Sequence, residues 1–180
     1  ACVDAAIALM DEHHLHCTDV ERVHAGVADV VIRQTGFAYQ ADTVLNAQMS
    51  LQYNVAIAMT DRQALLEQFT PDRIKDAAVF ELAQRVDVVA DAELDAIYPE
   101  VYGGRVTLML KNGSTLTLCI RYSKGMPENP MDLEDIVRKY RTLATAVISA
   151  DEAERVLQAG LDWFEADSSA PLVQAMEGLT

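Results

Sequence analysis

The sequence predicts an α+β fold in which helices pack on an antiparallel sheet of about three or four strands. The main observation is a β-hairpin pattern. Residues 105–111 (RVTLMLK) alternate in polarity, Asn112-Gly113 supplies a turn with positive φ, and residues 114–122 return. The second observation is a series of helix-length segments that begin with capping residues. Helices that surround one antiparallel sheet define the α+β class.

The segments before the hairpin follow in order. Residues 3–14 carry apolar side chains at helical spacing and predict a helix. Residues 20–33 are rich in valine and isoleucine and predict a strand, with a bulge at Gly26. Residues 42–61 predict one continuous helix, and Asp42 is its expected N-cap.

The middle of the chain predicts a helix, a strand and a short helical turn. Thr70-Pro71 predicts the start of a helix that ends near Val86, because a capping threonine followed by proline is common in a first turn. Residues 86–90 are apolar and β-branched, which favours a strand. Residues 92–98 predict one or two helical turns.

Helices follow the hairpin, in which Val106, Leu108 and Leu110 are expected to share one face. Asp132 is expected to cap a helix that ends near Ile148. Three more features complete this part of the prediction: a capping box of Ser149 and Glu152, the helix of residues 151–165 that it begins, and a short helix over residues 171–176.

Composition excludes several functions. The chain has 180 residues, 51% of them hydrophobic, with 14 basic and 28 acidic residues and a formal net charge of −14. A nucleic-acid or anionic-membrane partner requires a basic surface, so neither is expected. No apolar run reaches the length of a membrane span, and no signal segment begins the chain. Three cysteines suit a reducing compartment, which predicts a cytoplasmic protein.

The domain organisation predicted is one α+β domain over residues 1–180. The chain starts at Ala1 without methionine, and residues 1–10 already have a helical pattern. We therefore expect it to be part of a longer polypeptide.

The most informative stretch is residues 47–60 (AQMSLQYNVAIAMT), in which a polar cluster leads into an apolar run. A helix that is apolar on all sides is buried, and polar groups buried beside it need partners. The cluster is therefore a satisfied core network or part of a ligand site. Tyr53 is the best candidate, because a phenol donates to carboxylates and relays protons, although a core tyrosine bonded to a carbonyl is the alternative. Ser50 lies about one turn away on a similar face.

Two further candidates have ordinary alternatives. Lys124 precedes a glycine in a loop with two prolines, where it would bind a carboxylate or remain a surface lysine. His13, His14, His16 and Cys17 are of metal-ligand type, but neighbouring helical residues point about 100° apart, so a solvated helix end is the alternative and no metal site is predicted. No nucleophile elbow, P-loop, dinucleotide fingerprint or zincin motif is present.

Six segments in order resemble the C-terminal domain of the MmgE/PrpD family. They span roughly residues 1–165 and are ACVDAAIAL, DVERV, AQMSLQYNVAIAM, PDRIKDAAVFELAQRVDVVAD, RVTLMLKNGSTLT and KGMPENPMDLEDIVRKYRTLA. The resemblance implies a smaller α+β lid domain joined to a larger helical N-terminal domain, which this sequence does not include. It also implies an active site between the two domains and, for many members, a homodimer.

The chemistry that the resemblance implies is cofactor-independent. Substrates are small di- or tricarboxylates such as methylcitrate or cis-aconitate, and a proton is abstracted next to a carboxylate before water or carbon dioxide is lost. No metal or organic cofactor is expected. The isolated 180 residues would be inactive, because the resemblance places most catalytic groups outside them. Epimerase chemistry and a non-catalytic interaction or dimerisation domain remain alternatives.

The resemblance also implies roles for individual residues. The tyrosine of the family's QY pair matches Tyr53, which would contact the substrate as a catalytic residue. Ser50 and Lys124 are weaker substrate-binding candidates. A basic residue is frequent in the family two positions before this serine, where Gln48 stands here, so a charge contact from that position is not expected.

Overall fold

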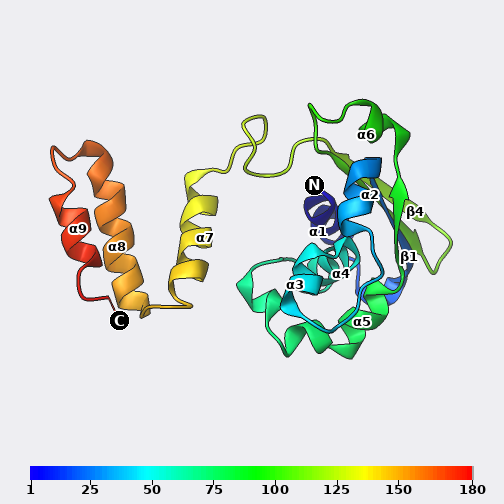
Figure 1. The fold of residues 1–180 in the computed structure, drawn as a ribbon, viewed down its shortest axis with the longest axis horizontal. Coiled ribbons are helices and arrows are strands. Elements are labelled where there is room, and N and C mark those ends of the chain that lie inside the picture. The colour runs from blue at the N-terminus through cyan, green and yellow to red at the C-terminus, as the bar shows by residue number, and fades with distance from the viewer. Residues whose placement is uncertain (180) are drawn as a thin grey trace. The chain divides into compact units, whose positions relative to one another are not determined.

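The chain folds into two compact units, seen in the computed structural model, which describes residues 1–179 (Figure 1). The first unit comprises residues 1–129 and holds the whole sheet. The second begins at Pro130 and is helical in its described part. The prediction that residues 1–180 act as one domain of a longer protein stays a prediction.

The sheet of the first unit has four strands in the order β2-β1-β3-β4. The strands are β1 (Val20–Val27), β2 (Val86–Ala90), β3 (Gly104–Leu110) and β4 (Thr115–Ile120). The α+β class is confirmed, but the expectation of a purely antiparallel sheet was wrong, because β1 and β2 are parallel. Parallel strands need a long crossover connection, and here residues 28–85, which are largely helical, provide it.

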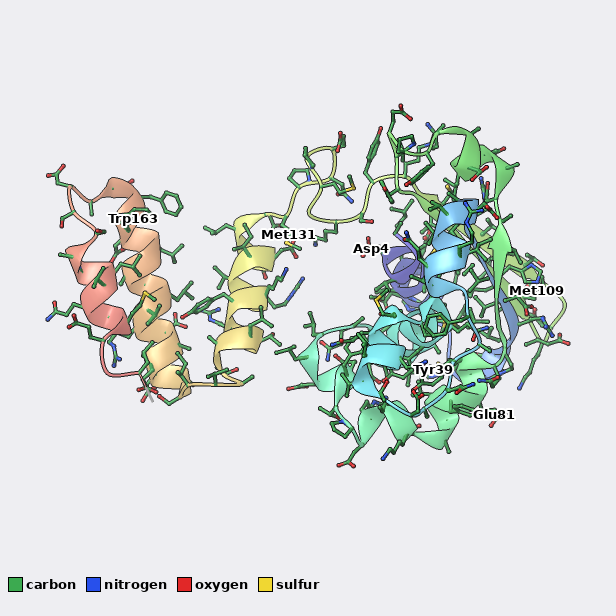
Figure 2. The ribbon with its side chains drawn as sticks, in the orientation of Figure 1. Asp4, Tyr39, Glu81, Met109, Met131 and Trp163 are labelled. Carbon is green, nitrogen blue, oxygen red and sulfur yellow. The ribbon has the colours of Figure 1, made fainter. Side chains whose placement is uncertain are left out.

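The core of the first unit lies between one face of the sheet and helices of residues 1–129. The helices of this unit are α1 (Cys2–Glu12), α2 (Asp29–Thr35), α3 (Val44–Met49), α4 (Leu51–Asp61), α5 (Ala77–Ala83) and α6 (Ala92–Ala96), with 3₁₀ turns η1 (Cys17–Asp19), η2 (Leu66–Phe69) and η3 (Arg73–Lys75). Every residue from Val55 to Met59 of α4 is buried, which confirms that this apolar run lies in the core. Tyr39 lies among these helices, as Figure 2 shows.

Two predicted elements are divided in the structure. The strand expected over residues 20–33 ends at Val27, and the valines after it belong to α2, whose first residue Asp29 donates its backbone N–H to the carboxylate of Asp95 at 2.9 Å. The helix expected over residues 42–61 is two helices, and Thr43 rather than Asp42 caps the first of them. Tertiary contacts outweighed local propensity in both places.

A third helix begins later than predicted. The start expected at Thr70 is a turn, and α5 begins after Asp76, whose carboxylate accepts from the backbone N–H groups of Ala78 and Val79. That cap satisfies two donors that a helix start leaves without partners. By contrast, β2 and the β3–β4 hairpin are confirmed at their predicted places, with the apolar face of β3 buried.

The second unit contains α7 (Leu133–Ala144), α8 (Ala150–Asp162), η4 (Trp163–Glu165) and α9 (Ala170–Met176). The predicted N-cap at Asp132 and the capping box of Ser149 and Glu152 are both confirmed. Helix α7 ends at Ala144, short of the predicted end near Ile148. The Tyr140 hydroxyl donates to the carbonyl oxygen of Ala153 at 3.0 Å and ties α7 to α8.

Candidate ligand site at the α3–α4 junction

Ser50 is the residue at which α3 ends and α4 begins. Its φ of −84° and ψ of 114° lie outside the helical region. The side chain is buried, and its Oγ accepts a hydrogen bond from the backbone N–H of Tyr53 at 3.3 Å. Ser50 therefore caps α4 in this structure. Its role in substrate binding stays a prediction.

Asn54 closes the junction from the side of α4. Its Nδ2 donates to the carbonyl oxygens of Ala47 and Gln48, each at 3.1 Å, and of Ser50 at 2.7 Å. The last carbonyls of a helix have no partner within that helix, and a polar side chain that reaches them satisfies them. One side chain of α4 thus binds the end of α3.

Gln52 joins the same junction to the sheet. Its Oε1 accepts from the backbone N–H of Tyr39 at 2.7 Å, and its Nε2 donates to the carbonyl oxygen of Val86 at 3.0 Å. Val86 is the first residue of β2. The polar cluster that stands out in the sequence is therefore an internal hydrogen-bond network.

Tyr53 lies in the core beside this network. Its hydroxyl donates to the carbonyl oxygen of Gln68 at 2.5 Å, and its ring packs on Tyr39 with a centroid distance of 4.8 Å. Burial, together with the neighbouring Tyr39, raises the pKa of Tyr53 above its ordinary value. The phenol is therefore neutral over the physiological range and acts as a hydrogen-bond donor. Its catalytic role stays a prediction, and one that requires the bond to Gln68 to open.

An ion-pair network holds the segment that carries Gln68. Arg73 contacts the carboxylate of Asp61 at 2.5 Å and that of Asp76 at 2.7 Å, and Gln68 Nε2 donates to Asp61 at 3.0 Å. The Arg73 and Asp61 side chains are only 26% and 20% exposed. The hydrogen bond to Asp61 raises the pKa of Arg73 further, so the guanidinium stays charged.

A cavity of about 310 Å³ opens beside the α3–α4 junction. Residues 1–3, 27–35, 48–54 and 102–103 contribute to it, and the lining residues are Ala1, Cys2, Val3, Val27, Val31, Thr35, Gln48, Met49, Leu51, Asn54, Tyr102 and Gly103. None of these side chains carries a charge at neutral pH, and burial raises the pKa of the Cys2 thiol to about 11. A carboxylate that entered this cavity would need a cation from elsewhere, since a buried unpaired charge is unfavourable.

The predicted site residues are only partly brought together. Ser50 and Tyr53 are hydrogen-bonded neighbours, but neither lines the cavity. Lys124 lies in a separate exposed loop, where its backbone N–H donates to the carboxylate of Asp4 at 3.2 Å. Sequence reasoning missed Thr35 and Tyr102 as cavity residues, because nothing local marks residues that meet only after folding.

The histidine-rich segment follows α1. Over residues 1–179, no group of three or more His, Cys, Asp or Glu side chains is arranged to hold a metal ion. The Sγ of Cys17 lies 3.7 Å from the Oγ1 of Thr60. Over the same residues, none of the helices has the length and apolar character that crossing a membrane would take.

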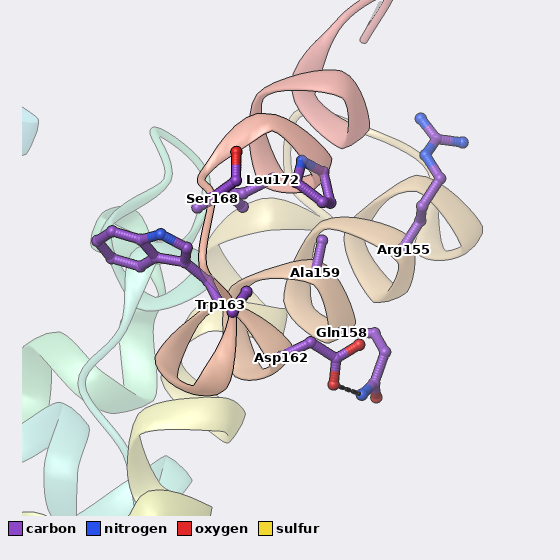
Figure 3. A pocket seen from close by; sticks show the side chains of 9 residues that line it. Arg155, Gln158, Ala159, Asp162, Trp163, Ser168 and Leu172 are labelled. Carbon is purple, nitrogen blue, oxygen red and sulfur yellow. Dashed lines mark hydrogen bonds between the residues drawn. The ribbon is translucent and has the colours of Figure 1, made fainter.

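A second cavity, of about 410 Å³, belongs to the second unit (Figure 3). It lies between α8 and α9, with Trp163 and Leu172 among its lining residues. At the edge of this cavity, Gln158 donates a hydrogen bond to the carboxylate of Asp162 at 2.7 Å. It contains none of the predicted site residues.

The fold defines an α+β domain in which one face of a four-stranded mixed sheet is covered by helices and a small cavity lies at a helix junction. Sequence comparison is more specific, because residues 1–164 match the MmgE/PrpD C-terminal domain. The chain belongs to the MmgE/PrpD family, as the six segments predicted.

Similar proteins include fungal enzymes. A cis-aconitate decarboxylase from Aspergillus terreus is 34% identical over 119 residues, which are 64% of this chain and 24% of that protein. A second of the same name and species is 30% identical over 131 residues, 72% of this chain and 26% of that protein. A cis-aconitate decarboxylase-like protein from Aspergillus oryzae is 26% identical over 140 residues, 77% of this chain and 29% of that protein. The chain thus spans about a quarter of the length of these relatives.

Proposed function

We propose that this chain is the C-terminal domain of a cofactor-independent lyase that acts on a small di- or tricarboxylate such as cis-aconitate or methylcitrate. The observation that carries the proposal is the family match over residues 1–164, together with relatives named cis-aconitate decarboxylase. The isolated chain is inactive in this proposal, and it acts in the cytoplasm as part of a homodimeric enzyme with a helical N-terminal domain.

The cavity beside the α3–α4 junction is the proposed contribution of this domain to the site. It lies against Gln48, Met49 and Asn54, which belong to one of the six stretches that resemble the family. The side chains that line it are uncharged, so the carboxylates of the substrate would be met by cations of the remaining protein or by Lys124. Ser50 and Tyr53 are the other proposed contacts. Tyr53 would donate a proton or a hydrogen bond to a substrate carboxylate.

A non-catalytic interaction domain with the same fold is the second candidate. The observation in its favour is that the side chains of Ser50, Gln52 and Tyr53 all bond to groups of the fold itself. Epimerase chemistry shares the proton abstraction and is a third candidate for the same site.

The test is an assay of the full-length protein that contains this chain, with cis-aconitate and methylcitrate followed separately by product detection. Decarboxylation or dehydration of either acid, unchanged by a chelator, is the expected result. Turnover of neither acid, with a folded protein, would favour the interaction domain. Inversion of a stereocentre without loss of water or carbon dioxide would select the epimerase.

A further inference from the structure

Strand β4 ends the sheet of the first unit and leaves one backbone edge without a neighbouring strand among residues 1–129. The hydrogen-bond pattern identifies the groups on that edge. Leu110 donates to the carbonyl oxygen of Ser114 at 2.8 Å, and paired residues of an antiparallel ladder exchange bonds at every second position. The backbone groups of Thr115, Thr117 and Cys119 therefore point away from β3.

This edge lacks the features that usually protect edge strands. The sequence of β4, TLTLCI, contains no charge, proline or glycine, and β4 pairs regularly with β3 along its length. Free edges that are not blunted by charge, proline or a bulge are templates for another strand. The opposite edge strand, β2, differs: it carries Asp87, which pairs with Arg22, and the carbonyl of Val86 accepts from Gln52.

The side chains of β4 make the strand complementary to itself. Leu116 and Leu118 pack toward the core, whereas Thr117 lies on the other face, where its hydroxyl is 3.0 Å from that of Thr107. In an antiparallel pair of two β4 strands centred on Thr117, Leu116 of one copy lies opposite Leu118 of the other. The apolar face would then continue across the junction, and threonine would face threonine.

The lack of charge on β4 permits the same partner. The chain has a formal net charge of −14, so two copies repel each other over most of their surfaces. The β4 edge is a stretch in which neither copy presents a charged side chain. We propose that the β4 edges of two copies pair antiparallel about a twofold axis through Thr117, which joins two four-stranded sheets into one.

The test compares the same charge at two positions on one face of the sheet. Thr117→Lys puts a lysine on the edge, while the matched control Thr107→Lys puts it on the central strand β3, opposite Thr117. A six-residue edge predicts a weak dimer, so the mass of the 180-residue chain is measured by sedimentation from about 1 µM to about 500 µM. The wild type and Thr107→Lys should approach twice the monomer mass, and Thr117→Lys should remain monomeric.

A second measurement reports on the edge itself. At the dimer-forming concentration, the backbone amides of Thr115, Thr117 and Cys119 should exchange with deuterium at least about tenfold more slowly than in the dilute chain. Thr115→Lys replaces Thr117→Lys if the latter does not fold. A chain that stays monomeric throughout, equal loss of the dimer in both lysine variants, or a dimer in which these amides exchange fast would each overturn the proposal.

Discussion

The hydroxyl of Tyr53 donates a hydrogen bond to the backbone carbonyl oxygen of Gln68 at 2.5 Å in the core of the first unit. A neighbouring tyrosine makes the same kind of contact, because the Tyr39 hydroxyl donates to the carbonyl of Ile74 at 2.5 Å. The two rings are adjacent and both are buried. Comparing variants of the two tyrosines can therefore separate a structural role of Tyr53 from a chemical one.

Tyr53→Phe in the full-length protein tests whether this tyrosine takes part in the reaction. Both Tyr53→Phe and Tyr39→Phe leave a carbonyl without its partner, and each should lower the free energy of unfolding by about 1–3 kcal/mol. If Tyr53 takes part in the reaction, only its variant should also lower kcat, by about 100-fold or more. Denaturant unfolding and steady-state rates are the measurements. Equal kcat values in the two variants would remove Tyr53 from the mechanism.

Asn54→Ala tests the closure of the α3–α4 junction. The variant leaves the carbonyl oxygens of Ala47, Gln48 and Ser50 without the amide that binds them, and we expect a loss of about 1–3 kcal/mol in the free energy of unfolding. Asn54→Asp should lose more stability than Asn54→Ala, since its carboxylate would be repelled by three carbonyl oxygens. Asn46→Ala is the control. Its Oδ1 accepts one exposed bond from Gln40 at 3.3 Å, and a change within about 0.5 kcal/mol is expected. Equal losses at both positions would contradict this account.

Gly104→Ala tests the approach of α1 to the sheet. A Cβ at this position would lie 2.5 Å from the Sγ of Cys2 and 2.9 Å from its backbone nitrogen, so α1 must shift. We expect a loss of about 1–3 kcal/mol in stability. Gly160→Ala in α8 is the control, because its nearest neighbour, Leu172, is 4.0 Å away and alanine favours helix by about 1 kcal/mol. The midpoint temperature of thermal unfolding should therefore fall in Gly104→Ala and rise in Gly160→Ala. An unchanged midpoint in Gly104→Ala would refute the close contact.

The carboxylate of Asp91 should make the stability of the fold depend on pH. Burial opposes ionisation of Asp91, but hydrogen bonds from Arg105 and from the backbone N–H of Leu94 outweigh it, so the pKa of Asp91 lies below its ordinary value. A lowered pKa in the folded state stabilises the fold above the unfolded-state value of about 3.9, and this contribution is lost as the pH falls through the folded-state pKa.

Asp91→Asn should therefore be less stable than the wild type at pH 7, by about 1–3 kcal/mol, and the difference should shrink below roughly pH 4. Glu93→Gln is the control: Glu93 also pairs with Arg105, but its side chain is 82% exposed, so a change of at most about 1 kcal/mol is expected. Denaturant unfolding between acidic and neutral pH gives both curves. A gap between wild type and Asp91→Asn that stays constant down to acid would show that the carboxylate is not responsible.

The elements predicted correctly are those decided by neighbours in sequence. The hairpin follows from alternation and the Asn112-Gly113 turn, and the capping box of Ser149 and Glu152 follows from their spacing. The errors lie where distant residues decide. The residues after Val27, predicted as strand, form a helix whose first backbone amide donates to Asp95. Strand β2 lies parallel to β1 because helices join the two strands.

The sequence alone determined the family, the α+β class, the hairpin and the burial of α4, because order, periodicity and turn chemistry are local properties of a chain. It also drew attention to the polar residues between Ser50 and Asn54. Only the tertiary structure decided what those residues do. Their partners, among them Gln68 and Val86, are far along the chain, and four separate stretches of the chain meet to form the cavity. Hydrogen-bond satisfaction in a core depends on such distant partners, which no local pattern specifies.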